Sequence, residues 1–321
     1  MTKASVCMLA YNTSPYIGQA IESALSQKTN FDFEIVISEN CSTDDTRDIV
    51  LDYRNRYPDK IKVILNPVNI GMPANFVLAY RNCAGKYIAT LDSDDYWCDP
   101  NKLQKQVDFL ESNPDYGVVY SDSRVVNENN EEIEWDEMDY YRSQFTSGYL
   151  FFRLLKEAAF ILHNTTCFRK DLIKEELERD DLWYFEDWWL YMRLSIKTKM
   201  RYMNWITSCY RMHQANATNN RMKCKTFANW YKAKSYAVFY SNVTYFDEYN
   251  RNKLSQAEKE LVFRKVLMLL YRPHGSLLMK IRLIPMLFRY FPGFLKLKNI
   301  VYRKWVRCDY GLFVTLAVDF G

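Results

Sequence analysis

The sequence predicts an α/β protein with a mostly parallel sheet flanked by helices. Apolar runs of strand length alternate with segments of helical periodicity over residues 5–121, which is typical of a doubly wound sheet. Polar side chains follow directly where four of these apolar runs end. After residue 121 the alternation is lost, so we expect the sheet to end in a mixed, partly antiparallel half.

The predicted strands of the regular part are five short apolar runs. They span residues 5–10, 33–38, 61–65, 86–91 and 116–121. Each has the length of a buried strand and is bounded by turn or helix signals.

End signals mark the helices between these strands. Ser14-Pro15 predicts an N-cap followed by proline in the first turn of a helix. Ser42 or Thr43 is placed to cap a second helix, which runs through Tyr53.

Two further helices precede the fourth and fifth strands. The helix over 74–83 is expected to end at Gly85, a candidate C-terminal glycine. Asp99-Pro100 opens the next helix and Asn113-Pro114 closes it.

The region after residue 121 is less regular. Residues 127–141 hold seven acids and no bases, which predicts a solvated loop or, alternatively, a lid on the acceptor side. Helical patterns return at 149–159 and 186–197, and 164–170 and 201–213 have the composition of strands.

Composition narrows the class of protein. The 321 residues include eight cysteines without a CxxC and three histidines, so a zinc site is not expected. Because a signal peptide and an apolar run of spanning length are missing from the sequence, we expect a cytoplasmic protein with free thiols. Eleven Lys or Arg and no Asp or Glu lie in 261–308, which favours a surface-binding tail over a body that binds nucleic acid.

Polar side chains gather where the predicted parallel strands end. They are Tyr11 and Asn12 after the first strand, Glu39 and Asn40 after the second, Asn69, Gly71 and Asn75 after the third, and Asp92, Asp94 and Asp95 after the fourth. Because ligands of such sheets bind at the carboxyl ends of the strands, this pattern predicts a polar ligand across one rim.

The acids of LDSDDYW, residues 91–97, fit a divalent cation. Mg²⁺ and Mn²⁺ prefer oxygen ligands and are often held by one or two carboxylates together with phosphate oxygens. The repulsion among Asp92, Asp94 and Asp95 would then be relieved when a cation and a diphosphate bind. The alternative is that Asp92 and Asp95 only cap the following turn.

Two later segments carry further candidate residues. Glu186 and Asp187 open an aromatic helix, where they either complement the helix dipole or provide a partly desolvated general base. Arg211 and His213 share a face of a predicted strand and could reach phosphate oxygens or the metal. His213 could equally be an ordinary surface or core histidine.

Taken together, these stretches resemble a family 2 glycosyltransferase of the GT-A fold, a Rossmann-like α/β fold. The resemblance covers about residues 3–218 and runs in the family's order through VCMLAYN, EIVISENCSTDDT, NIGMPANF, GKYIATLDSDDYW, FEDWWLYMRL and YRMHQANAT. Similar bacterial proteins build capsule, lipopolysaccharide or exopolysaccharide repeats.

By position, the resemblance implies a site for a nucleotide-diphosphate sugar. Its expected residues are Ala10, Tyr11, Asn12, Glu39, Asn69, Asn75, Asp92, Ser93, Arg211 and His213. Glu39 matches the acid that holds the base or the ribose. The family often has an Asp-Asp pair where this chain has Glu39-Asn40, so the base contacts are expected to differ in detail.

The metal site follows from the same resemblance. Asp92 and Asp94 match the family's D-x-D motif, and Asp95 adjoins it, so that either Asp94 or Asp95 could be the closer ligand of Mn²⁺ or Mg²⁺. His213 is a further candidate ligand.

The resemblance also implies the reaction. Asp187 matches the catalytic base, Glu186 adjoins it, and Arg211 and His213 match a segment that closes on the diphosphate. The family implies a metal-dependent, inverting transfer from a nucleotide-diphosphate sugar, with uridine diphosphate favoured by family frequency. The acceptor would be a hydroxyl of a glycan or a lipid-linked glycan.

The expected domains are a catalytic domain and an extension. Residues 1–220 would form the first, with a nucleotide-binding half, 1–121, and an acceptor half, 122–220. Residues 221–321 would form a helical, basic and aromatic extension. Within it, 261–308 mixes bases with apolar residues, which predicts helices on an anionic membrane surface, peripheral to the inner face of the plasma membrane. The alternative is a small helical domain packed on the catalytic body.

Two other functions compete with the transferase. A sugar-phosphate nucleotidylyltransferase would be expected to have a Gly- and Arg-rich loop after the first strand, where this chain has AYNTSPY. A non-enzymatic sugar- or nucleotide-binding scaffold of the same fold is disfavoured by the intact Asp92, Asp94 and Asp187.

Overall fold

The computed structural model describes residues 2–157, 160–178, 186–214, 216, 239–246, 255–271, 280 and 283–286. The chain divides into two compact units, Met1–Asn242 and Val243–Gly321. The domain boundary expected at residue 220 lies outside the described residues.

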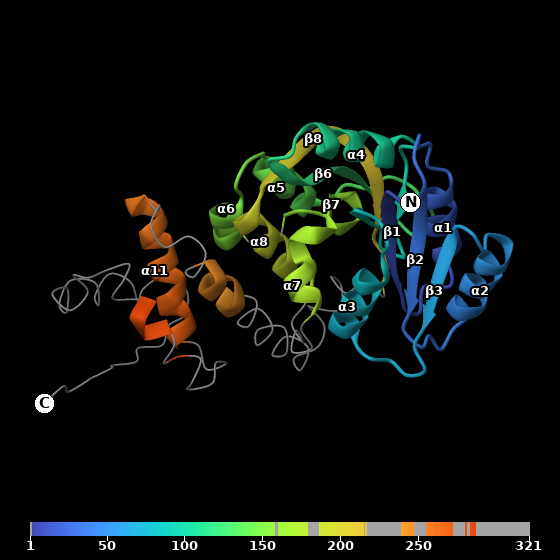
Figure 1. Ribbon diagram of the computed structural model, residues 1–321, viewed down its shortest axis with the longest axis horizontal. Helices are drawn as coiled ribbons and strands as arrows, with labels where there is room; N and C mark the ends of the chain where they lie inside the picture. The colour runs from blue at the N-terminus through green and yellow to red at the C-terminus, as the bar shows by residue number, and fades with distance from the viewer. Residues whose placement is uncertain are drawn as a thin grey trace, which may run out of the picture. The chain divides into compact units, whose positions relative to one another are not determined.

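The first unit is built on one eight-stranded sheet of order β3-β2-β1-β4-β7-β6-β8-β5 (Figure 1). The strands are β1 Ala4–Ala10, β2 Phe33–Glu39, β3 Ile61–Leu65, β4 Tyr87–Thr90, β5 Tyr96–Trp97, β6 Tyr116–Val126, β7 Cys167–Arg169 and β8 Lys199–Arg211. The first four pair in parallel. β7 is antiparallel to both its neighbours, β6 and β8 are parallel, and β5 is antiparallel to β8. This confirms the predicted mixed α/β sheet.

Helices flank the sheet and share its apolar core. They are α1 Ile17–Leu25, α2 Thr46–Arg56, α3 Met72–Asn82, α4 Lys102–Ser112, α5 Asp136–Gln144, α6 Phe151–Glu157, α7 Lys174–Leu177 and α8 Asp187–Lys197, with 3₁₀ turns η1 His163–Thr165 and η2 Lys170–Ile173. A further helix, α11 Gln256–Tyr271, belongs to the second unit. Apolar residues of α1 and α4 are buried in one cluster with Val6 and Met8 of β1, while α3 packs against β1 and β2. Because both faces are covered, the parallel strands consist mostly of apolar residues.

The first helix begins later than the sequence predicts, so the N-cap at Ser14 is wrong. α1 starts at Ile17. The backbone N–H groups of Tyr16 and Ile17 both donate to the carbonyl of Thr13, at 2.9 and 3.0 Å, and form a turn. The N–H of Ser14 donates to the Asp44 carboxylate at 3.0 Å, which ties this turn to the loop before α2.

The predicted cap of the second helix is also wrong. α2 starts at Thr46, whose N–H is 3.1 Å from the Asp44 carboxylate. Ser42 and Thr43 bond to the first strand's loop instead: Ser42 Oγ accepts the N–H of Asn12 at 3.0 Å, and the N–H of Thr43 donates to Asn12 Oδ1 at 2.8 Å. Two neighbouring loops are thereby joined at the rim.

Gly85 has a different role from the predicted helix end. α3 ends at Asn82 and the backbone is already extended at Cys83. A Cβ atom on Gly85 would lie 2.5 Å from the carbonyl carbon of Ala4. Glycine is therefore needed here for the close approach of the chain to β1, and not for a left-handed turn.

Two segments after residue 121 differ from their predictions. The acidic stretch 127–141 is not a loop throughout, because α5 begins at Asp136 with three acids in its first turn, where they complement the helix dipole. The strand expected over 164–170 is shortened to β7, because the residues before Cys167 wind into η1.

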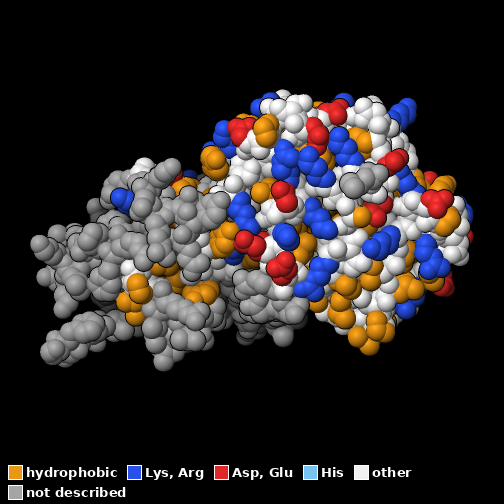
Figure 2. Space-filling view, viewed as in Figure 1, with side chains coloured by type: hydrophobic (Ala, Val, Ile, Leu, Met, Phe, Trp, Pro, Cys, Tyr) orange, Lys and Arg blue, Asp and Glu red, His pale blue; other side chains and the backbone are white. Residues whose placement is uncertain are grey.

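The second unit is described mainly through α11. In the described part of the chain, no helix has the length and apolar character needed to cross a membrane. Of the predicted membrane-surface segment 261–308, residues 261–271 form the end of α11, and 272–308 lie almost entirely outside the described residues. On the visible face of the described surface, Lys and Arg are interspersed with Asp and Glu (Figure 2).

Candidate active site

The predicted polar rim exists because the parallel strands are in register. Ala10 at the end of β1 pairs with Glu39 at the end of β2, and β4 pairs with the other side of β1. The end of β8 reaches the same rim from the mixed half, because the N–H of Arg211 donates to Asp95 Oδ1 at 2.8 Å. The residues predicted to bind the nucleotide and the acids after β4 therefore share one edge of the sheet.

Asp95 is bonded inside the protein through both carboxylate oxygens. Oδ1 accepts the N–H of Arg211, and Oδ2 accepts Asn164 Nδ2 at 2.7 Å. Its side chain is buried, and burial, followed by the charges of Asp94 and Asp92, raises the pKa of Asp95 well above its ordinary range. These contacts suit a residue that stabilises the turn formed by residues 92–95, called the acid turn below.

Asp94 is the more accessible acid of the pair. Its side chain is 24% exposed. Its Oδ2 lies 3.0 Å from His213 Nε2 and 3.4 Å from Asn216 Nδ2. The His213 ring packs on Tyr16, with the ring centroids 4.8 Å apart. The geometry thus favours Asp94 over Asp95 as the acid that faces a ligand.

Asp92 interacts electrostatically with Asp94 and with Asp187. Burial raises its pKa well above the ordinary range, and the charges of Asp94 and Asp187 raise it further. An acid just after β4 and an acid at the start of α8 therefore interact, although they lie 95 positions apart in the chain. A bound cation would relieve this repulsion.

Asp187 is the first residue of α8 and is half-buried. Its Oδ1 accepts the N–H of Trp188 at 2.7 Å. Glu186 is buried and extended, and its carbonyl accepts the N–H of Leu190 at 2.9 Å. Of the two acids, Asp187 is therefore the one placed toward the open side of the helix start.

Arg211 is buried and donates to several groups of the protein. Its Nε donates to the carbonyl of Asp94 at 2.8 Å, and Nη2 donates to Gln19 Oε1 at 2.6 Å. The guanidinium also lies over the rings of Tyr16 and Tyr96, at 4.8 and 5.4 Å from their centroids. Arg211 thus organises the acid turn, and its contact with a diphosphate stays a prediction.

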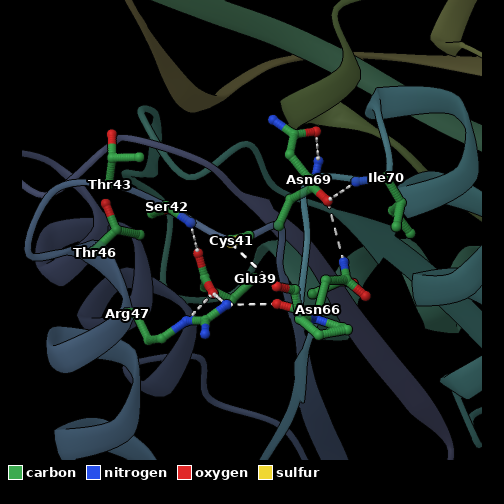
Figure 3. A network of polar contacts seen from close by, with 12 residues as sticks. Glu39, Cys41, Ser42, Thr43, Thr46, Arg47, Asn66, Asn69 and Ile70 are labelled. Atoms are coloured by element: carbon green, nitrogen blue, oxygen red, sulfur yellow. Dashed lines mark hydrogen bonds and ion pairs between the residues drawn. The ribbon is translucent and has the colours of Figure 1, made fainter.

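Glu39 is fully buried at the end of β2 and paired with an arginine. Its Oε2 accepts Arg47 Nε at 2.5 Å, and its Oε1 accepts the N–H of Ser42 at 2.6 Å. Arg47 Nη2 also donates to the carbonyl of Asn66 at 2.7 Å. Figure 3 shows this pair under the loop that follows β2. Ser42 and Arg47 therefore hold the carboxylate of Glu39, the acid predicted to contact the base or the ribose.

Asparagine side chains join the loop after β3 to the end of β2. Asn40 Nδ2 donates to Asn69 Oδ1 at 3.0 Å, and Asn40 Oδ1 accepts the N–H of Ile70 at 3.0 Å (Figure 3). Asn75 is buried, and its Oδ1 accepts Ser38 Oγ at 2.6 Å. Asn69 thus lies at the rim, while Asn75 supports the strand behind it.

The loop after β1 has one exposed side chain and an unusual backbone. Tyr11 is 44% exposed while Ala10 is buried. Asn12 has a φ of 53°, a left-handed conformation that asparagine tolerates better than most residues. Ser93 Oγ accepts Thr13 Oγ1 at 3.0 Å, so this loop and the acid turn are directly bonded.

Sequence reasoning missed the residues that hold these groups. They are Gln19, Arg47, Asn164 and Asn216. Arg47 is the only base in CSTDDTRD, and Asn216 lies in YRMHQANAT, so both offered a weak signal. Gln19 and Asn164 offered none, because their partners are distant in the chain.

The donor set fits Mn²⁺ or Mg²⁺ in company with a diphosphate. No group of three His, Cys, Asp or Glu side chains that could hold a metal is found within the described ranges. One or two carboxylates, here Asp94 and Asp92, are what such cations use when phosphate oxygens complete the shell. The residues present therefore suit a metal that binds together with its nucleotide.

Comparison with known proteins decides the family. A family model described as glycosyl transferase family 2 matches residues 5–177, more than half of the chain. The chain belongs to this family.

Individual relatives agree with this assignment. An uncharacterized protein of Mycobacterium tuberculosis is 30% identical over 210 residues, which cover 65% of this chain and 58% of that protein. Escherichia coli WfaP, named a UDP-Glc:alpha-D-GlcNAc-diphosphoundecaprenol beta-1,3-glucosyltransferase, is 40% identical over 113 residues, covering 35% of this chain and 43% of WfaP. The chain thus matches about half the length of these curated relatives.

A solved structure confirms the predicted fold. Residues 1–349 of Staphylococcus aureus TarS, in complex with UDP-GlcNAc, align with a TM-score of 0.60 over 95% of this chain and 76% of that TarS chain. Its sequence identity of 19% shows the fold and no more.

Proposed function

We propose that this protein transfers a sugar from a nucleoside diphosphate donor, with a UDP-sugar favoured, to a hydroxyl of a glycan or lipid-linked glycan. The product would serve bacterial cell-surface polysaccharide synthesis. One observation carries the proposal: the partly exposed carboxylate of Asp94 contacts His213 and Asn216 at the rim where β1, β2 and β8 also end. This edge of the sheet is where a sheet of this kind binds its ligand.

The donor is proposed to bind across β1, β2 and β4. Asn69 would face the nucleoside, Glu39 would hold the loop after β2 against the base or ribose through Ser42, and Tyr11 would offer its exposed ring beside it. The UDP-linked names of WfaP and of the TarS complex support uridine diphosphate as the first nucleotide to test.

The metal is proposed to sit at Asp94, with Asp92 beside it. When bound, Mn²⁺ or Mg²⁺ would neutralise charge on the departing diphosphate. His213 and Asn216 contact Asp94 and would hold its carboxylate toward the ligand.

Asp187 is proposed as the general base. It would accept the proton of the acceptor hydroxyl while that oxygen attacks the anomeric carbon from the face opposite the diphosphate. A single displacement of this kind inverts the anomeric configuration, and holding both substrates in line supplies much of the rate.

A thermal-shift titration tests donor binding first. The protein is heated with UDP, GDP, dTDP or CDP, each with and without Mn²⁺, because a ligand of the folded state raises the Tm with its saturation. We expect a rise with UDP that needs Mn²⁺ and that Asp94→Asn abolishes. Asp108→Asn, a change of an exposed acid on α4, is the matched control. An unchanged Mn²⁺-dependent shift in Asp94→Asn would show that the metal assignment is wrong.

A transfer assay separates an enzyme from a scaffold. The purified protein is incubated with UDP-sugars, Mn²⁺ and lipid-linked sugar acceptors, and released UDP and the glycosylated product are measured together. Nucleotide binding without product from any donor and acceptor pair would favour the binding scaffold of the same fold.

A further inference from the structure

A chain of buried side-chain hydrogen bonds lies behind the acids of the site. The Tyr191 hydroxyl is 2.8 Å from His163 Nδ1 and 2.9 Å from Thr166 Oγ1. Thr166 Oγ1 is in turn 2.6 Å from Thr90 Oγ1. Thr90 Oγ1 also donates to the carbonyl of His163, so the four residues close a ring.

The ends of this ring belong to the two elements that carry the reacting acids. Thr90 is the last residue of β4, two positions before Asp92. Tyr191 lies one helical turn after Asp187 on α8, so the two side chains share a face of that helix. The ring thus connects the acid strand to the helix of the proposed base.

Three members of the ring are buried and none carries a charge. Thr90, Thr166 and Tyr191 are at most 1% exposed, and His163 is half-buried. Burial lowers the pKa of His163 to about 4 and raises that of Tyr191 well above its ordinary range, so the imidazole is neutral and the phenol protonated near neutral pH.

One assignment of protons satisfies every bond of the ring. His163 Nδ1–H donates to Tyr191, Tyr191 to Thr166, Thr166 to Thr90, and Thr90 to the carbonyl of His163. Each hydroxyl then donates once and accepts once. A buried polar network that is fully satisfied holds its members in one geometry.

Hydrogen bonds link the two elements that carry these acids. The Tyr191 hydroxyl of α8 bonds to Thr166 Oγ1, which bonds to Thr90 Oγ1 of β4, and Tyr191 also interacts with Thr90 itself. We propose that Tyr191 is a positioning residue that fixes Asp187 relative to Asp92 through Thr166 and Thr90. The inference rests on the proposed function, since it assigns a role in proton transfer.

Removal of single hydroxyl groups tests this role. Tyr191→Phe and Thr166→Val each break the ring, whereas Thr166→Ser keeps the hydroxyl. Tyr120→Phe is the matched control, because Tyr120 is equally buried and its hydroxyl bonds to the backbone of Thr146 at 2.6 Å. For each variant, the Tm, the Kd for UDP with Mn²⁺ and the kcat of sugar transfer are measured.

The expected result is a loss of kcat without a loss of donor binding. A base displaced by a fraction of an ångström should lower kcat about tenfold in Tyr191→Phe and Thr166→Val, with the Kd for UDP within about twofold of wild type. Thr166→Ser should recover most of the rate lost in Thr166→Val. Tyr120→Phe should lower the Tm as Tyr191→Phe does, yet keep the wild-type kcat.

Two outcomes overturn the inference, and they differ from a failure of the function itself. If wild type transfers sugar and Tyr191→Phe keeps its kcat, the ring is only part of the core. If kcat and UDP affinity fall together, the ring supports the donor site and not the base. If wild type transfers no sugar from any donor, the proposed function fails and the positioning role fails with it.

Discussion

The parallel half of the sheet, β3-β2-β1-β4, and the mixed half, β7-β6-β8-β5, place their parts of the site by different means. In the parallel half, regular apolar strands end at one rim, and backbone loops supply the expected nucleotide contacts. The mixed half buries hydroxyl and amide side chains along its strands and in η1, namely Ser121, Ser123, Asn164, Thr165, Thr166, Thr207 and Ser208. The parallel half also buries polar side chains, and several of them, such as Glu39, Asn40 and Asn66, lie where its strands end. Apolar packing sets where strands lie, whereas bonded polar groups also set how side chains point. Polar groups of both halves therefore hold the side chains of the proposed site.

The variant Asp187→Asn should distinguish most clearly between sugar transfer and donor binding. Loss of a general base typically costs about 10²–10⁴-fold in rate, so transfer should nearly vanish. UDP with Mn²⁺ should still raise the Tm as in wild type, because Asp187 is not among the residues proposed to contact the donor. Wild-type transfer by this variant would show that the base lies elsewhere.

Arg47→Ala tests how the parallel half holds its one buried acid. Without Arg47, whose side chain is 31% exposed, the buried Glu39 carboxylate keeps only the N–H of Ser42 among its described partners, and leaving a buried acceptor short of a partner costs about 1–3 kcal/mol. Urea unfolding should show this loss. Arg56→Ala on the same helix removes exposed pairs with Asp52 and Glu22 and should cost less than about 1 kcal/mol. Equal losses in the two variants would contradict the buried-pair account.

Gly85→Ala tests the close approach of the chain to β1. A Cβ there would lie 2.5 Å from backbone carbon of Ala4, and forced shifts of this kind cost about 1–3 kcal/mol. Gly18→Ala in α1 meets nothing closer than 3.7 Å and should be neutral or stabilising by up to about 1 kcal/mol. Chemical denaturation of both variants measures the difference, and a stable Gly85→Ala would show that the strand can move away.

Lys102 in α4 should make stability depend on pH. It is buried, it bonds to Gln106 Oε1 at 2.8 Å, and burial lowers its pKa from 10.5 to about 7, against smaller opposing effects of Cys167, Asp99 and Cys98. Between these two values the unfolded chain holds a proton that the folded protein lacks. The free energy of unfolding should therefore rise by about 1.4 kcal/mol per pH unit from this group.

Comparison with variants isolates this effect. From pH 7 to pH 9, wild type should gain stability relative to Lys102→Met in urea unfolding. Lys105→Met changes an exposed lysine paired with Asp99, and its free energy of unfolding should change with pH as that of wild type does. If the free energy of unfolding of Lys102→Met also follows wild type across this pH range, the lysine is charged in the folded protein.

Predictability from sequence follows the same division of the sheet. The parallel strands and α8 were predicted nearly to the residue, because apolar periodicity is local and strong. The starts of α1 and α2 were not, because Ser14 and Ser42 bond to neighbouring loops and not to their own helices. Gly85 was assigned to a helix end because its contact with Ala4 is invisible in the local sequence.

By itself, the sequence determined the alternation of strands and helices, the acids that end the fourth strand and the resemblance to family 2 glycosyltransferases. Only the tertiary structure decided which of two adjacent acids faces outward. Asp95 is bonded to Arg211 and Asn164, whereas Asp94 keeps an exposed edge beside His213. The ring of Thr90, Thr166, Tyr191 and His163 is likewise visible only in the tertiary structure. The physical reason is that periodicity and end signals are local, while a hydrogen bond between side chains 25 to 76 positions apart exists only once the sheet has brought their strands together.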